Sequence, residues 1–117
     1  MFTVYVYALD TMADWEIGYV TAELNSGRFF KKDAPVVTVK TAGISRSPIK
    51  TMGGLTIIPD CVVDDIAVSE KSVLLLPGGN TWDDPKHSSV VRKAAELLSA
   101  GGTACAICGA TVALAHA

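Results

Sequence analysis

Four stretches of the chain are rich in apolar and β-branched residues, and each has the length of a single β-strand. They are residues 2–9 (FTVYVYAL), 34–42 (APVVTVKTA), 72–79 (SVLLLPGG) and 103–107 (TACAI). The first and third are apolar on both of their alternating faces, which indicates strands buried on two sides. This pattern is typical of a parallel sheet that helices cover on both faces.

Three other segments carry helix signals, and they are residues 11–27, 84–102 and 109–117. In the first, Trp15 and Tyr19 belong to a set of residues at helical spacing, and Asn25-Ser26-Gly27 is a stop signal. In the second, Pro85 suits the first turn and the pair Gly101-Gly102 ends the helix. The chain therefore alternates strands with helices.

Two further segments are less regular. Residues 43–60 predict a hairpin or an irregular excursion at the sheet edge, and residues 61–69 predict a short helix or turn.

The whole order of the elements predicts one α/β domain over residues 1–117, with a flavodoxin-like, doubly wound and mostly parallel sheet. Ligands bind beyond the carboxyl ends of strands in such sheets. Those ends are the loops 10–16 and 77–82 and the turn at Cys108.

The composition narrows the class of protein. Half of the 117 residues are apolar, which is enough for one hydrophobic core without disulfide bonds. The net charge is −2 and the basic residues are scattered, so the chain has no basic patch of the kind that binds nucleic acids. No apolar stretch reaches the ~20 residues that a membrane-spanning helix needs. Three cysteines without a secretory signal indicate a cytoplasmic protein with free thiols. Nothing implies a metal or an organic cofactor.

The end of the fourth strand carries the most informative chemistry. A buried strand runs into Cys108, and the small residues Gly109, Ala110 and Thr111 follow at once. A tight strand-to-helix turn needs small residues, so the segment predicts a nucleophile elbow with sulfur in place of oxygen. We expect the turn to lift the thiol out of the sheet and the new helix to favour its thiolate. The N–H of Gly109 would face a developing oxyanion.

Other interpretations of the cysteines stay open. A CxxC redox or metal motif needs both sulfurs on one face, whereas Cys105 lies within a strand and Cys108 on the turn, which sends them to opposite faces. Buried inert thiols are common in proteins, and we expect Cys61 and Cys105 to be such residues. For Cys108 taken alone, a packing role and a catalytic role are about equally supported.

Three segments carry a family resemblance, and they are ALDTMADWEIGYVTAEL, VLLLPGGNTWDD and TACAICGATVALA. In this order and spacing they resemble the DJ-1/PfpI family, which belongs to the class I glutamine-amidotransferase-like superfamily. The resemblance covers all 117 residues. The A-[IV]-C-x-[GA] elbow after a strand is its most specific part, followed by LPGG and by the glutamate after the first strand.

The resemblance implies roles for several residues. Cys108 would be the family's reactive cysteine, and Glu16 the glutamate near it, thought to be protonated and hydrogen-bonded to the sulfur. The other interpretation of Glu16 is a solvated residue on an amphipathic helix. Gly79 and Gly109 would supply the two amides of an oxyanion hole. Residues that we expect beside the cleft are Trp15, Asn80 and Trp82, although packing is the commoner role of a tryptophan.

The chain also departs from the family. The family's histidine follows the cysteine directly or lies further downstream, whereas Gly109 follows Cys108 here. His116 would stand about 12 Å along the helix axis, and we expect His87 to be exposed to solvent. The family's domain normally continues beyond this point, so we expect its C-terminal part to be missing. A stable form would then include that segment or a second copy of the chain.

The sequence therefore predicts a cysteine-dependent hydrolase or lyase-like enzyme that acts on a small carbonyl, amide or ester compound. Cys108 would attack the carbonyl and Glu16 would handle the thiol proton. One alternative is an oxidative-stress sensor or chaperone-like protein that uses the same cysteine without turnover. Another is a glutaminase subunit that passes ammonia to a partner, which the missing histidine–glutamate pair disfavours.

Overall fold

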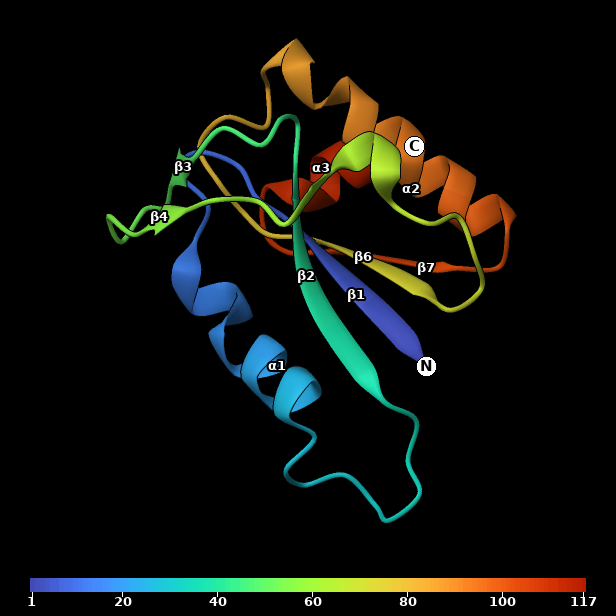
Figure 1. The fold of residues 1–117 in the computed structure, drawn as a ribbon. Helices are drawn as coiled ribbons and strands as arrows, with labels where there is room; N and C mark the ends of the chain where they lie inside the picture. The colour runs from blue at the N-terminus through green and yellow to red at the C-terminus, as the bar shows by residue number, and fades with distance from the viewer.

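A five-stranded parallel sheet runs through the middle of the protein, and a computed structural model describes all of residues 1–117 (Figure 1). The strands lie in the order β5-β2-β1-β6-β7. They are β1 (Phe2–Tyr7), β2 (Val37–Gly43), β5 (Cys61–Val62), β6 (Ser72–Leu76) and β7 (Thr103–Ala106). Every pairing is parallel, which confirms the predicted sheet. The edge strand β5 was expected to be a helix or turn, but only the short helix η1 (Val63–Asp65) behind it is helical.

The two main helices cover opposite faces of this sheet (Figure 1). Helix α1 (Asp14–Ser26) joins β1 to β2, and α2 (Ser88–Ser99) joins β6 to β7, preceded by the short helix η2 (Pro85–His87). From the centre of the sheet the chain therefore moves outward in both directions, and right-handed crossovers then place the helices on different faces. This arrangement confirms the doubly wound fold. The last helix, α3 (Ala110–Leu114), follows β7.

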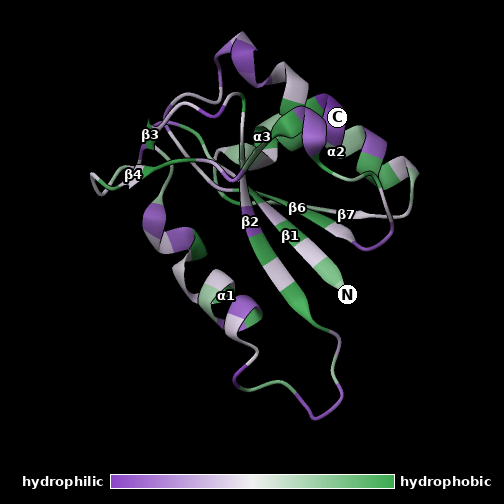
Figure 2. Ribbon diagram, in the orientation of Figure 1, coloured by the Kyte–Doolittle hydropathy of each residue, from purple (hydrophilic) through white to green (hydrophobic).

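The hydrophobic core lies mainly between the sheet and α2. Val90, Ala94 and Leu97 are spaced so that one side of α2 meets the sheet, and all three are fully buried. They pack in one cluster with Leu74 and Leu76 of β6. In Figure 2 the central strands β1 and β6 are coloured mainly as apolar, and α2 alternates between apolar and polar residues. The α2 side of the sheet therefore supplies most of the apolar burial.

Helix α1 is packed more loosely than α2. The helix predicted over 11–27 is present from Asp14, but none of its residues is fully buried. Ile17 and Leu24 are half-buried against the core, whereas Trp15 and Tyr19 are 67% and 85% exposed. The spacing of the aromatic residues thus predicted the helix, but these residues lie on the face away from the sheet.

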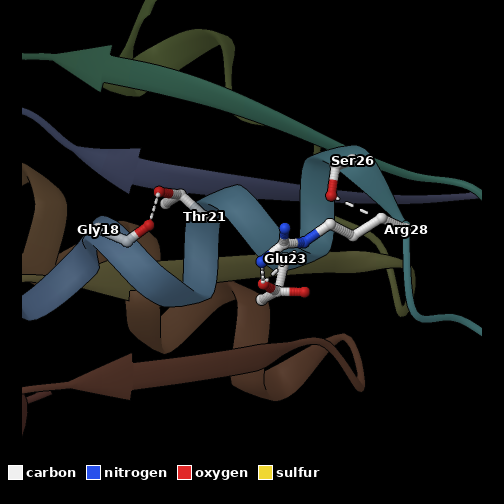
Figure 3. A network of polar contacts seen from close by, with 5 residues as sticks. All are labelled: Gly18, Thr21, Glu23, Ser26 and Arg28. Carbon is white, nitrogen blue, oxygen red and sulfur yellow. Dashed lines mark hydrogen bonds and ion pairs between the residues drawn. The ribbon is translucent and has the colours of Figure 1, made fainter.

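The predicted stop signal ends α1. Gly27 adopts the left-handed conformation and its N–H donates to the carbonyl oxygen of Glu23 at 3.0 Å. Just beyond it, the Arg28 guanidinium binds the Glu23 carboxylate (Figure 3). Because this ion pair is exposed, it stabilises the helix end only slightly.

A small hairpin lies outside the main sheet, as the sequence predicted for residues 43–60. Its strands are β3 (Ile49–Lys50) and β4 (Thr56–Ile57). The Asp14 carboxylate holds the hairpin by accepting hydrogen bonds from the Thr51 hydroxyl and, at 2.8 Å, from the Gly53 N–H. The Thr51 hydrogen bond lowers the pKa of Asp14. The hairpin is therefore attached to the segment that carries Glu16.

None of the helices is both long and apolar enough to cross a lipid bilayer.

Candidate functional site around Cys108

The carboxyl ends of β1, β6 and β7 bring the three predicted segments together. Cys108 follows β7 by two residues and has a φ of 52°, in the left-handed region that non-glycine residues rarely adopt. The Ile107 N–H donates to the Leu76 carbonyl, so the backbone stays attached to the sheet up to this bend. The sharp turn predicted at Cys108 is therefore present, and its thiol is exposed.

Glu16 and Cys108 meet at Gly78. The Glu16 carboxylate accepts a hydrogen bond from the Gly78 N–H, with 2.8 Å between nitrogen and Oε1. A Cβ atom added at Gly78 would lie 2.7 Å from Glu16 Oε1 and 3.1 Å from Cys108 Cβ. The acid and the cysteine therefore approach the same point from α1 and from the turn after β7. Only a residue without a side chain fits between them.

Gly79 and Gly109 are also neighbours. A Cβ at Gly109 would lie 3.7 Å from the carbonyl oxygen of Gly79. The N–H groups of these two glycines donate to no acceptor in the chain, whereas the Gly78 N–H is taken by Glu16. Two free N–H groups therefore lie on the segments next to Cys108, where an anionic oxygen could accept from them.

The 77–82 loop is held by Thr11, which sequence reasoning missed. The Thr11 hydroxyl accepts from the Asn80 N–H at 2.8 Å, and the Ala13 N–H donates to the Gly78 carbonyl at 3.0 Å. Thr11 has a φ of 71°, a strained value for a β-branched residue. The only sequence signal was a threonine among polar residues after the first strand. Asn80 is exposed beside this contact.

Trp82 supports the loop from behind. Its Nε1–H donates to the Pro77 carbonyl at 2.9 Å, and its Cδ1 lies 3.8 Å from the Cβ position of Gly109. The indole ring packs against Tyr7 and His87, with centroid distances of 5.6 Å and 4.8 Å. Trp82 thus combines packing with contact to the Cys108 turn.

The expectation that His87 is exposed is wrong. The ring is 2% exposed, because the Tyr7 hydroxyl hydrogen-bonds its Nδ1 and the Trp82 indole covers it. Burial, reinforced by the nearby Lys86 charge, lowers the pKa of His87. Burial also raises the pKa of Tyr7 well above its ordinary value. Both groups are therefore neutral at pH 7.

Trp15, expected beside the cleft, is 67% exposed on α1. It borders a shallow groove along α1 together with Gly18, Tyr19 and Arg28. None of the five surface cavities of the structure is lined by Cys108 or Glu16. The cleft expected around them is accordingly an open turn.

The other cysteines differ from each other. Cys105 was expected to be buried but is exposed, and it lies on β7, the edge strand of the sheet. Cys61 is half-buried, its Sγ lies 3.6 Å from the Thr41 carbonyl oxygen, and burial raises its thiol pKa. No group of three His, Cys, Asp or Glu side chains is arranged to hold a metal ion.

The helix after Cys108 is short. Helix α3 has five residues, and no side chain caps its first turn at Gly109. A helix of little more than one turn carries a weak dipole, so the expected stabilisation of the thiolate by the helix is small. Contacts with neighbouring groups must provide most of any activation of the thiol.

Comparison with known proteins gives a consistent result. A sequence model described as the DJ-1/PfpI family matches residues 2–117. A Bacillus subtilis protein named "Uncharacterized protease YoaZ" is 47% identical over 113 residues, which are 97% of this chain and 54% of that protein.

Solved structures agree with this match. A thiJ/pfpI family protein from Bacillus anthracis superposes with a TM-score of 0.92 at 46% identity, over 98% of this chain and 55% of its own. DJ-1beta from Drosophila melanogaster superposes with a TM-score of 0.72 at 24% identity, over 97% of this chain and 59% of its own, and shows the shared fold. The chain thus spans about half the length of the relatives that it matches.

Proposed function

The chain belongs to the DJ-1/PfpI family, and we propose on that basis that Cys108 is the nucleophile of an enzyme that acts on small carbonyl, amide or ester compounds. The observation that carries the proposal is the approach of Glu16 and Cys108 to the same point at Gly78. Acyl transfer requires a nucleophile, a group that takes its proton and donors for the oxyanion. Cys108 on its strained turn, the Glu16 carboxyl group and the two free N–H groups correspond to these three parts.

The proposed reaction begins with the thiol proton. Glu16 Oε1 is fixed by the Gly78 N–H, while its Oε2 makes no hydrogen bond within the chain and is free to take a proton. As the proton moves from Cys108 Sγ to Glu16, a sulfur lone pair forms a bond to the carbonyl carbon. The π electrons of the carbonyl move to its oxygen, which accepts hydrogen bonds from the N–H groups of Gly79 and Gly109.

The intermediate then collapses. With an amide or ester, the carbonyl re-forms, the bond to the amine or alcohol breaks, and the leaving group takes the proton from Glu16. The thioester on Cys108 is cleaved by water, which returns a proton to the sulfur and releases a carboxylic acid. With an aldehyde no leaving group is present, so the oxygen takes the proton back from Glu16 and the product is a hemithioacetal on Cys108.

A second candidate is an oxidative-stress sensor. The observation that favours it is the open position of Cys108, whose thiol is exposed and borders none of the cavities. Peroxide needs no shaped substrate pocket and oxidises an accessible thiolate to sulfenate and then sulfinate. A cytoplasmic location, which we also propose, would keep the thiol reduced between oxidation events.

We further propose that the working protein includes additional polypeptide next to Cys108. The edge strand β7 exposes Thr103 and Cys105 on its uncovered face, and the Cys108 turn opens nearby. A second copy of the chain, or sequence corresponding to the rest of the longer relatives, would provide the missing wall of the site.

Hydrolysis of a small ester tests the leading proposal. With p-nitrophenyl acetate, the protein should release more than one equivalent of nitrophenolate and carry an acetyl group on Cys108 after an acid quench. Cys108→Ser should lose both signals, and Cys105→Ser is the matched control because that thiol is also exposed. Release that persists in Cys108→Ser would contradict the proposal. Stoichiometric sulfinate at Cys108 with hydrogen peroxide, without turnover of the ester, would favour the sensor.

A further inference from the structure

A buried polar chain lies behind the 77–82 loop and takes no part in the proposed reaction. The Tyr7 hydroxyl lies 2.7 Å from Nδ1 of His87, and Nε2 of the same ring lies 3.0 Å from the Thr81 hydroxyl oxygen. Both ring nitrogens are therefore engaged, one by the last residue of β1 and the other by the loop that carries Gly79.

Tyr7 determines the direction of these hydrogen bonds. The residue is fully buried, and its hydroxyl has a single hydrogen-bond partner in the chain, Nδ1 of His87. If the Tyr7 proton pointed elsewhere, a buried donor would lack an acceptor, which costs free energy. Tyr7 therefore donates to Nδ1, and the neutral ring carries its proton on Nε2 and donates it to Thr81.

The same ring supports the Cys108 turn through Trp82. The indole lies with its centroid 4.8 Å from that of His87, and its Nε1–H holds the Pro77 carbonyl at 2.9 Å. On its other side, the indole contacts the position of Gly109 at 3.8 Å. His87 thus contacts the 77–82 loop at Thr81 and Trp82, and Trp82 in turn holds Pro77 at the start of the loop.

We propose that His87 is a positioning residue for the Cys108 site, which in its Nε2–H form holds the 77–82 loop against the turn and which releases the loop on protonation. A protonated ring carries hydrogen on both nitrogens, so Nδ1 no longer accepts from Tyr7. The Tyr7 oxygen can accept from the new Nδ1–H, but the Tyr7 proton becomes a buried donor without an acceptor, and the ring shifts away from both Tyr7 and Thr81. The inference rests on the proposed function, because that function places Gly79 of this loop at the reacting oxygen.

The charged groups around His87 come from several elements. A cavity of about 170 Å³ at the ends of β1 and β2 reaches the ring and is also lined by Asp10 and Lys86. A second cavity reaches it from the side of α2 and α3, where the titratable or charged neighbours are Asp83, Asp84, Arg92 and His116. Burial and Lys86 oppose protonation, and the two aspartates favour it, with burial the largest effect. Water in either cavity gives a proton a route to the ring.

The two tryptophans make the proposal measurable by nuclear magnetic resonance. In a titration from pH 7.5 to 5.0, the indole N–H signal of Trp82 should shift with the same midpoint as the His87 ring and lose protection from solvent exchange. The exposed Trp15 is the internal reference and should not follow that midpoint. The ¹⁵N shifts of the His87 ring should show Nδ1 without a proton at pH 7.5.

Two variants at one position connect the loop to the thiol. Thr81→Val keeps the shape but removes the hydroxyl, whereas Thr81→Ser keeps it. We expect alkylation of Cys108 by iodoacetamide at pH 7.5 to slow by about fivefold in Thr81→Val, as for the loss of one hydrogen bond, and to recover in Thr81→Ser. Cys105 should react equally in both variants.

The inference would be overturned if the Trp82 indole N–H signal did not shift with the His87 titration. It would also be overturned if Cys108 were alkylated at equal rates in the two Thr81 variants. Glu16→Gln separates this failure from that of the proposed function. If Glu16→Gln changes Cys108 reactivity while the Thr81 variants do not, the function stands and the positioning role of His87 is wrong. If the Trp82 and Thr81 results are as expected while Glu16→Gln has no effect, the positioning role of His87 stands and the proposed role of Glu16 is wrong.

Discussion

Glu16 and Cys108 approach each other across Gly78, at a point 2.7 Å from the carboxylate oxygen Oε1 and 3.1 Å from Cys108 Cβ. The acid belongs to the first turn of α1 and the cysteine to the turn after β7, so the contact depends on the packing of the whole sheet. A methyl group at Gly78 would occupy this point.

Gly78→Ala should therefore separate the acid from the thiol. We expect a loss of about 1–3 kcal/mol in the free energy of unfolding, as for an overpacked buried site, and a Cys108 alkylation profile like that of Glu16→Gln. Gly18→Ala is the matched control, because nothing lies within 4 Å of its Cβ position on α1, and it should stabilise the protein by roughly 0.5–1 kcal/mol. Urea unfolding of both variants measures the difference. Equal stability of the two variants would contradict the close approach at Gly78.

Tyr7→Phe removes the hydroxyl that donates to His87 and leaves Nδ1 of a buried ring without a partner. We expect the free energy of unfolding to fall by about 1–3 kcal/mol. Tyr5→Phe is the control, since the Tyr5 hydroxyl makes only a 3.5 Å contact with the Ala67 N–H. That variant should change stability by less than about 0.5 kcal/mol. Similar losses in both variants would show that the Tyr7–His87 hydrogen bond contributes no more to the free energy of unfolding than the weak Tyr5 contact.

The buried state of His87 predicts how stability depends on pH. Its pKa is lowered in the folded protein, so below the ordinary value of about 6.5 the unfolded chain binds the proton more readily. The free energy of unfolding should be at its full value above pH 6.5 and should fall as the pH drops toward the lowered pKa. Urea midpoints between pH 5.5 and 7.5 measure this slope.

His87→Gln should flatten that dependence, because glutamine does not titrate. His116→Gln removes the other histidine, which is exposed, and shows whether the flattening is specific to His87. A slope that survives in His87→Gln would assign the effect to another group.

Asp14→Asn tests the attachment of the β3–β4 hairpin. The carboxylate accepts from both the Thr51 hydroxyl and the Gly53 N–H, and the amide can accept at only one of its atoms. We expect faster hydrogen exchange of the backbone N–H groups of residues 51–55, while β1 and β6 stay protected. Asp64→Asn, at an exposed position without a hydrogen bond, should leave the exchange unchanged. Unchanged exchange in Asp14→Asn would show that the hairpin is held by its other contacts.

The sequence predicted most elements because their signals are local. The apolar runs at residues 2–9 and 72–79 and the stop at Gly27 depend on nearby residues alone, and the structure contains all three features. The sharp turn at Cys108 was predictable for the same reason, because Gly109 and Ala110 directly follow it.

The remaining features depend on contacts between distant segments. His87 is buried by a hydrogen bond from a residue 80 positions earlier, and Cys105 is exposed because β7 lies at the sheet edge. Trp15 faces outward although its spacing fits a helix. The motif drew attention to Gly79, but Glu16 and Cys108 approach each other at Gly78. This contact depends on where α1 packs, which local sequence does not determine.

The pH dependence of Cys108 alkylation tests the central claim most directly. Iodoacetamide labelling, followed at the peptide level from pH 5 to 10, compares Cys108 with the exposed Cys105 in the same molecule. The proposed function predicts that the pH profile of Cys108 labelling differs from that of Cys105, and that Glu16→Gln changes the Cys108 profile alone. A Cys108 profile that coincides with that of Cys105 and that Glu16→Gln leaves in place would contradict it.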